Sequence, residues 1–128
     1  MPEIINWSFS IEAVDGPRVS GSDAMVVDAY DKVSVVLTAG VTNMDVQIQP
    51  ANVADRVQLL VIRASAFDAA ITFSADNGTT HFPLDGPVVL IGGGVVSILG
   101  GPPQTLQLAN GTASDVTVEI LVGRDSAP

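Results

Sequence analysis

Apolar and polar residues alternate with a period of two along most of this chain, and this period most constrains the fold. From Ile5 to Ala13 every second residue is apolar, and the residues between them are polar. Successive side chains of a β-strand point to opposite faces, so the pattern is typical of a half-buried strand. No stretch shows a convincing helical spacing of apolar residues. The sequence therefore predicts a protein built of strands.

About ten short strands are expected, separated by Gly, Pro, Asn and Asp. Their number and spacing predict an all-β fold, an antiparallel β-sandwich that is jelly-roll-like, with little or no helix. An immunoglobulin-type sandwich is disfavoured, because the chain has no cysteine pair and its single Trp lies in the first strand. The expected strands are residues 5–13, 24–29, 33–38, 44–49, 57–64, 69–75, 81–84, 88–91, 95–99, 105–109 and 116–122.

The segments between these strands carry further predictions. Residues 15–23 are expected to form a loop, 30–32 a turn, and 51–56 a helical turn or irregular crossover. The nearly continuous apolar run in residues 57–64 predicts a strand in the middle of a sheet. Asp76-Asn77-Gly78 predicts a hairpin turn. Val88–Ile91 is expected to pair with Val95–Leu99 across three glycines, and Thr105–Ala109 with Val116–Val122.

The length of 128 residues favours a single domain, residues 1–128. Within it, residues 1–6 form a possible extended N-terminal arm, and residues 124–128 a polar tail. An arm of this kind either pairs within its own domain or adds a strand to a neighbouring sheet edge.

Charge and composition exclude several classes of function. The chain has fourteen acidic and five basic side chains, which give a formal net charge of −9. It therefore lacks the basic surface that binding to nucleic acid or anionic lipid would require. The one uncharged apolar stretch, residues 87–103, is too broken by glycine for a membrane span. No signal peptide is visible. The absence of cysteine and the single histidine exclude thiolate or histidine-rich metal sites.

Three groups of residues are candidate chemical sites, and each has a simpler explanation. His81 lies between Asp76 and Asp85, but no activated nucleophile accompanies it. The acidic pairs Asp28 with Asp31 and Asp15 with Asp23, and Asp76 with Asn77, suit calcium by residue type but not by spacing, and are explained as turn residues. Glu12 and Glu119 could form a glycosidase pair, but they occupy the polar phase of their strands and are expected to be solvated. We predict no catalytic residue, cofactor or metal ion.

The aromatic residues admit two interpretations. Trp7 and Phe9 share the apolar phase of the first strand and are expected in the core, because a small sandwich needs large apolar side chains to fill it. If Trp7 and Tyr30 are instead exposed beside acidic groups, they would form a platform on which sugar rings stack.

The 29 residues between Asp85 and Asp115 carry no formal charge, although three strands are expected there. Exposed strands normally carry charged side chains, which prevent them from pairing with other chains. This region is therefore either enclosed by its own chain or covered in part by another subunit, and the sequence favours neither alternative over the other. The residues expected at a protein interface are Ile4, Ile5, Trp7, Val88, Leu90, Val95 and Ile98.

The chain resembles the small structural proteins of tailed-phage virions, the head-decoration or cement proteins. The resemblance rests on an acidic, cysteine-free β-domain with a single lysine, on the uncharged half PVVLIGGGVVSILGGPPQTLQLANGT, and on the strand VTVEILVGRD. It implies a non-enzymatic dimer or trimer that binds the major capsid protein of a phage and stabilises the shell. It also implies a place on the capsid surface of the virion after synthesis in the host cytoplasm. A carbohydrate-binding or adhesin-type β-sandwich module is the alternative, and a small enzyme a third.

Overall fold

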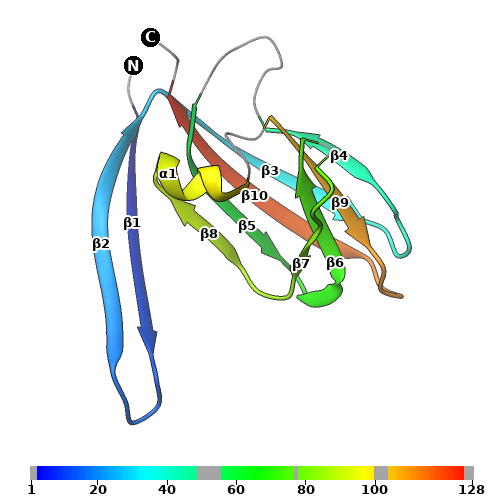
Figure 1. Ribbon diagram of the computed structural model, residues 1–128, viewed down its shortest axis with the longest axis horizontal. Coiled ribbons are helices and arrows are strands. Elements are labelled where there is room, and N and C mark those ends of the chain that lie inside the picture. The colour runs from blue at the N-terminus through cyan, green and yellow to red at the C-terminus, as the bar shows by residue number, and fades with distance from the viewer. Residues whose placement is uncertain (1–2, 49–55, 77, 100–103, 126–128) are drawn as a thin grey trace.

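The computed structural model describes residues 3–48, 56–76, 78–99 and 104–125. The described chain is built almost entirely of strands, with two short helical segments between the eighth and ninth strands (Figure 1). In chain order the elements are β1 (Glu3–Glu12), β2 (Arg18–Val27), β3 (Ala29–Leu37), β4 (Met44–Gln47), β5 (Arg56–Ala64), β6 (Asp68–Ala75), β7 (Phe82–Leu84), β8 (Val88–Ile91), α1 (Gly93–Val96), the 3₁₀ segment η1 (Ser97–Leu99), β9 (Thr105–Asn110) and β10 (Val116–Asp125).

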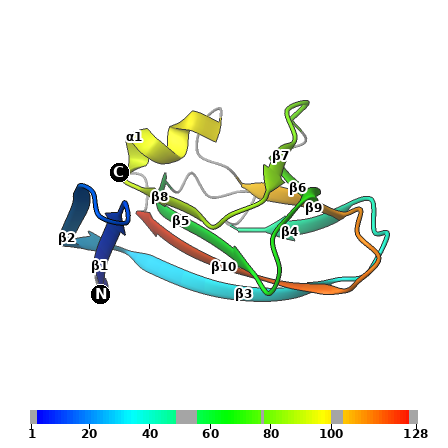
Figure 2. The ribbon, with the colours of Figure 1, turned by 90° about the horizontal axis from the view of Figure 1, so that it is seen from below.

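Strands β3 to β10 form two four-stranded antiparallel sheets that pack face to face. One sheet has the order β3-β10-β5-β8 and the other β4-β9-β6-β7, and Figure 2 shows the two layers. Counted from β3 as the first strand, these orders are 1-8-3-6 and 2-7-4-5, the strand arrangement of a jelly roll. The predicted all-β, jelly-roll-like antiparallel sandwich is therefore confirmed. The predicted central position of residues 57–64 is also confirmed, because β5 lies between β10 and β8.

The core lies between the two sheets and follows from the alternation within each strand. Along β10 the inward residues are buried, while the residues between them point to the outer surface. The apolar side chains of the facing sheet interdigitate with these, as stacked sheets about 10 Å apart require. The largest fully buried residues of the core cluster include Leu60, Ile62, Ile120, Ile71, Leu106 and Leu108.

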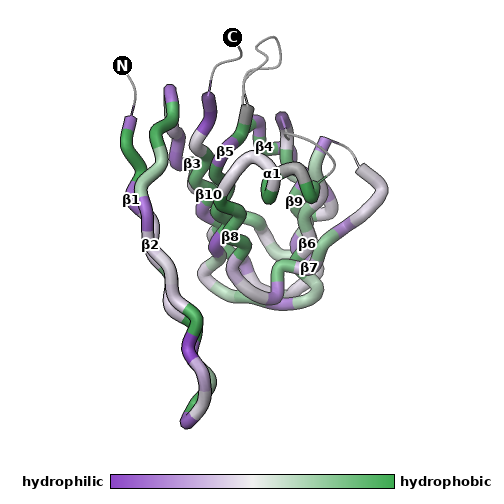
Figure 3. The backbone as a smooth tube through the Cα atoms, turned by 60° about the vertical axis from the view of Figure 1, so that its left-hand side comes forward, coloured by the Kyte–Doolittle hydropathy of each residue, from purple (hydrophilic) through white to green (hydrophobic). Residues whose placement is uncertain are grey.

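Strands β1 and β2 form a separate two-stranded hairpin, which we call the arm. It stands clear of the sandwich along most of its length (Figures 1 and 3). The prediction of a loop over residues 15–23 is wrong here, because β2 begins at Arg18 and pairs with β1 in unbroken register to Val27. The turn is confined to residues 13–17, where the Pro17 carbonyl accepts from the Ala13 amide. The small polar residues of β2 form a strand without a core beneath them, because pairing with β1 satisfies the hydrogen bonds of their backbone groups.

Two further predictions about turns and strands are wrong. The turn expected at residues 30–32 lies within β3, because β10 pairs with this strand as far as Ala29. The strand expected at Val95–Leu99 is helical: Gly92 ends β8 with a φ of 101°, and its carbonyl accepts from the amides of Val95 and Val96. This turn places Val96 in the core, and leaves β8 as a sheet edge instead of half of a hairpin.

The expected hairpin between Thr105–Ala109 and Val116–Val122 is also wrong, because β9 and β10 belong to opposite sheets. Asn110 supports this crossing. Its buried side-chain amide donates to the Leu37 and Ser114 carbonyls and accepts from Thr112, at 2.6–2.9 Å. The crossover predicted at 51–56 lies mostly outside the described residues, as do Asn77 of the predicted hairpin turn and residues 126–128 of the predicted tail. Among the described residues, neither helical segment has the length and apolar character to cross a membrane.

Candidate functional site

The arm has two chemically different faces. Residues paired across an antiparallel ribbon share a face, so the register assigns one set of side chains to each side of the arm. One side, which we call the apolar arm face, also carries Glu3 and Asp23; the other is mainly small and polar. The apolar members of the apolar arm face are Ile5, Trp7, Phe9, Ile11, Val19, Met25 and Val27.

The outer part of the apolar arm face is exposed in the part of the chain that the structure describes. Phe9 is 42% exposed and Ile11 70% exposed, and Trp7 is only partly buried. The expectation that Trp7 and Phe9 belong to the core is therefore wrong. The alternation does mark a strand with one apolar face, but this face does not pack inside the sandwich. An alternating strand looks the same whether its own chain or another molecule covers it.

The two aromatic rings of this face pack against each other. The ring centroids of Trp7 and Phe9 lie 6.2 Å apart with an interplanar angle of 13°. Phe9 also covers the opposite strand at Gly21, where an added Cβ would come within 2.9 Å of the Phe9 Cε1 atom. Glycine therefore leaves the space that the ring occupies.

The root of the arm packs on the outer surface of the β3-β10-β5-β8 sheet. Around Gly123 of β10, the position of a missing Cβ lies 3.0 Å from the Ile5 Cδ1 atom and 3.4 Å from Val27 Cγ1 and Leu59 Cβ. Val27 and Leu59 are consequently buried outside the sandwich core. The apolar arm face thus already contacts this sheet surface at one end.

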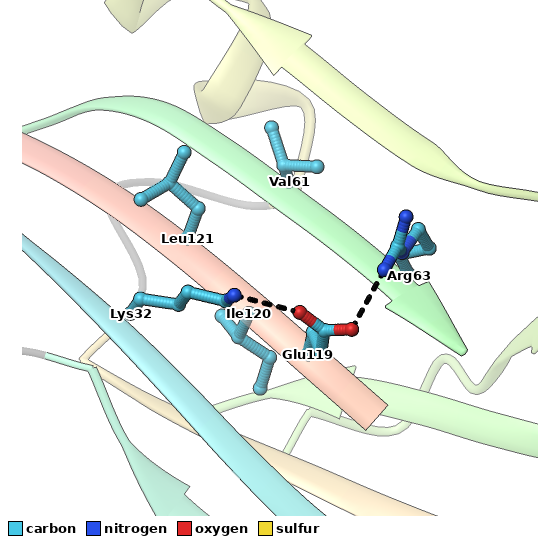
Figure 4. A pocket seen from close by; sticks show the side chains of 6 residues that line it. All are labelled: Lys32, Val61, Arg63, Glu119, Ile120 and Leu121. Atoms are coloured by element: carbon cyan, nitrogen blue, oxygen red, sulfur yellow. Dashed lines mark hydrogen bonds and ion pairs between the residues drawn. The ribbon is translucent and has the colours of Figure 1, made fainter. Parts of the chain in front are cut away.

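The same sheet surface carries a charged cluster on three neighbouring strands (Figure 4). Glu119 of β10 accepts a hydrogen bond from Arg63 of β5 at 2.7 Å and forms an ion pair with Lys32 of β3 at 3.0 Å. The Glu119 side chain is 30% exposed, against 63% for Lys32 and 66% for Arg63. The cations therefore extend beyond the carboxylate that they share.

The charges of this cluster do not cancel. The Arg63 hydrogen bond, followed by that of Lys32, lowers the pKa of Glu119 below its ordinary value of 4.5, so the carboxylate is ionised at neutral pH. Two cations then flank one anion, which leaves a local excess of positive charge on a chain that is otherwise strongly acidic. Exposed ion pairs of this kind contribute little to stability.

Apolar side chains surround the cluster. A depression of about 360 Å³ opens among them, lined by Lys32, Val61, Arg63, Glu119, Ile120 and Leu121. Exposed Tyr30 and Val36 of β3 and Val89 of β8 extend this outward surface. We call the surface formed by these outward side chains, Ile120 excluded, the cationic sheet face. A basic centre within an apolar frame is suited to an apolar partner that carries acidic groups.

The residues predicted for an interface lie on three separate elements. Ile5 and Trp7 lie on the apolar arm face, whereas Ile4 points to the other side of the arm and is exposed. Val88 and Leu90 are half-buried against the sandwich core. Val95 and Ile98 lie on the helical segments and are 39% and 72% exposed. The uncharged stretch is therefore partly enclosed by its own chain and partly exposed, and cover of the exposed part by another subunit stays a prediction.

The candidate chemical residues are dispersed. His81 and Asp85 are exposed, while the Asp76 carboxylate accepts from the amides of Gln104 and Thr105. Glu12 lies at the far end of the arm, away from Glu119 on the sheet.

Three of the aspartates suited to calcium by residue type have local structural roles. Asp31 pairs with Arg124 at 2.6 Å, and Asp23 accepts from the amide of Ala24. Asp15 has a φ of 57° in the arm turn. No group of three or more potential metal ligands occurs in residues 3–48, 56–76, 78–99 and 104–125.

Sequence reasoning missed the Lys32–Glu119–Arg63 cluster. Alternation correctly assigned Glu119 to an outward position, but the expected pairing of β9 with β10 hid its true neighbours. The strand order alone brings these three residues together. In comparisons with known proteins, no protein-family model, curated protein or solved structure matches this chain.

Proposed function

We propose that this chain is a non-enzymatic structural protein that associates with itself and decorates the outer surface of a phage capsid, where it reinforces the shell. The observation that supports this most is the arm, which carries an uncovered apolar face away from a jelly-roll sandwich. Large exposed apolar surfaces rimmed by polar groups mark sites of protein contact. A repeated lattice multiplies such small contacts into tight binding.

The distribution of polar groups favours a role in assembly over catalysis. The carboxylates of Asp76 and Asp115 accept backbone hydrogen bonds, and Asp31 and Glu119 form ion pairs. These groups serve turns and strand connections. The depression on the cationic sheet face is open to solvent, unlike the enclosed clefts in which substrates are desolvated.

The proposal can be tested on virions and on emptied phage heads from the source of the sequence. We expect immunogold labelling of the capsid exterior, and saturable co-sedimentation of the purified protein with emptied heads. An Ile11→Ser variant should bind less, whereas a Ser10→Ala variant on the other side of the arm should bind as the natural chain does. Protein that stays in the supernatant and is absent from purified virions would refute the proposal.

A carbohydrate-binding or adhesin-type module is the second candidate, because Tyr30 is exposed and Trp7 is partly exposed opposite Asp23. Stacked sugars use aromatic faces framed by hydrogen-bonding groups. Around Trp7 the apolar arm face carries Ile5, Met25 and the Phe9 ring that packs against Trp7, and this apolar setting suits protein contact better. Titration of Trp7 fluorescence with mono- and oligosaccharides distinguishes the two, and saturable quenching would favour the carbohydrate function.

A further inference from the structure

We propose that the apolar arm face of one copy docks on the cationic sheet face of a second copy, and that two copies exchange arms reciprocally. The inference rests on the structural role proposed above and specifies the surfaces through which copies associate. Its occupant is therefore a second copy of this chain.

The arm needs a partner for physical reasons. A two-stranded hairpin is at best marginally stable in water unless its apolar face packs against another layer. Among the described residues, such a layer lies at the root of this arm, where Ile5 and Val27 pack around Gly123. Further along, Phe9, Ile11 and Val19 remain exposed. A second layer supplied by another molecule would remove these side chains from water.

The contact at the root indicates which surface supplies that layer. There the apolar arm face lies on the outward side of the β3-β10-β5-β8 sheet in its own chain. The cationic sheet face is the continuation of this outward side over β3, β10 and β5. A neighbouring copy therefore presents the same kind of surface that the arm already contacts.

The charges of the two surfaces are complementary. The apolar arm face carries Glu3 at its root and Asp23 opposite Trp7 and has no basic residue, because Arg18 lies on the other side of the arm, opposite Glu12 in the register. The cationic sheet face offers Lys32 and Arg63 around the single carboxylate of Glu119. Acidic groups on an otherwise apolar arm would meet basic groups within an apolar frame, which favours this pairing over arm-to-arm contact.

The buried area requires that the exchange be reciprocal. A ribbon of two strands is about 10 Å wide, and the seven residues from Trp7 to Ala13 span about 24 Å, so one arm covers about 240 Å². Counting both surfaces, one docked arm buries about 500 Å² and two bury about 1,000 Å², the lower bound for a specific interface. One arm alone falls short of this bound.

The test uses Trp7 as its probe, because it is the only tryptophan of the chain and lies on the docking surface. Tryptophan emission and acrylamide quenching are followed from about 1 µM to about 1 mM protein, the span over which weak interfaces form, together with mass by light scattering. We expect a blue shift and reduced quenching that accompany conversion from monomer to dimer. A constant monomer mass overturns the proposal, and so does a dimer in which Trp7 stays accessible.

Surface variants test the contact itself. Ile11→Ser with Val19→Ser removes a cross-strand pair from the apolar arm face, and should raise the dimer dissociation constant about tenfold or more. The matched control, Ser10→Ala with Ser20→Ala, alters the pair on the opposite side and should leave dimerisation unchanged. Equal effects of the two double variants would overturn the proposal.

Charge exchange between chains tests which surfaces meet. Asp23→Lys and Lys32→Glu should each weaken self-association, because each creates two like-charged contacts in a reciprocal dimer. Mixed one to one, the two variants should form dimers again, because both contacts of the mixed pair are of opposite charge. Failure of the mixture to recover, with both chains folded by circular dichroism, overturns the arm-to-sheet contact.

Binding to emptied phage heads is scored separately. A dimer that does not bind heads leaves this inference standing and refutes the capsid role. Burial of Trp7 only after heads are added assigns the arm to the capsid protein and overturns the second copy as its occupant.

Discussion

The Phe9 ring lies over Gly21 across the arm, and its Cε1 atom is within 2.9 Å of the position that a Cβ would take there. A Gly21→Ala substitution should therefore displace the ring and separate it from Trp7. We expect a red shift of Trp7 emission and stronger acrylamide quenching, with little change in the melting temperature, because both rings lie outside the core. The control is Ser22→Ala on the other side of the arm, and an identical spectrum for the two variants would contradict the packing of Phe9 on Gly21.

Asn110 holds the connection between the two sheets through a fully buried amide. An Asn110→Asp substitution places carboxylate oxygens against the carbonyls of Leu37 and Ser114, which lose their donor. We expect a loss of about 3 kcal/mol in the free energy of unfolding, measured by urea denaturation. Asn43→Asp, at an exposed loop position, is the matched control and should cost little. Equal losses at the two positions would contradict a supporting role for the Asn110 amide.

The ion pairs of Glu119 predict a pH-dependent contribution to stability. Because Arg63 and Lys32 hold the pKa of Glu119 below 4.5 in the folded chain, the ionised form favours folding above that pH. The contribution is lost as the pH falls through the lowered pKa. A Glu119→Gln variant should melt at a slightly lower temperature than the natural chain at pH 7, because exposed ion pairs contribute little. The two melting temperatures should converge in acid, and a gap that is independent of pH would refute the interpretation.

The helical turn after β8 predicts unequal effects at two apolar positions. Val96 is fully buried in the core, whereas Ile98 is 72% exposed. Val96→Ala should lower the free energy of unfolding by about 2 kcal/mol through the cavity that it leaves, and Ile98→Ala should have almost no effect. Chemical denaturation of both variants measures this, and similar losses at the two positions would favour a strand at residues 95–99, in which residues 96 and 98 share a face.

Local patterns predicted the sandwich well, because alternation and turn residues are read one segment at a time. The inward residues of β10 and the central position of β5 follow from such patterns. The glycines at 92–94 were harder to interpret, since a Gly-rich break permits either a hairpin or a helical turn. Burial of Val96 decided between them, and it depends on a core that other segments build.

The candidate site depends on information that local patterns do not contain. The exposure of Trp7 and Phe9 depends on where the arm leaves the sandwich. The meeting of Lys32, Glu119 and Arg63 depends on strand order. Tyr30 and Lys32 were expected in a turn because their neighbourhood is polar, but pairing with β10 extends β3 through them. Sequence patterns therefore predict which face of a strand a side chain occupies, but they do not predict which strands become neighbours in a sheet.

The position of β10 has a consequence for the synthesis of the protein. It is the last strand of the sandwich in sequence, yet it lies between β3 and β5. While the nascent chain leaves the ribosome, those two strands therefore lack the neighbour that joins them, and their unpaired edges are open to other chains. Closure of this sheet must follow the translation of β10. We expect a slow, late folding step of the kind that many sequence-distant contacts impose, with the greatest need for chaperones just before it.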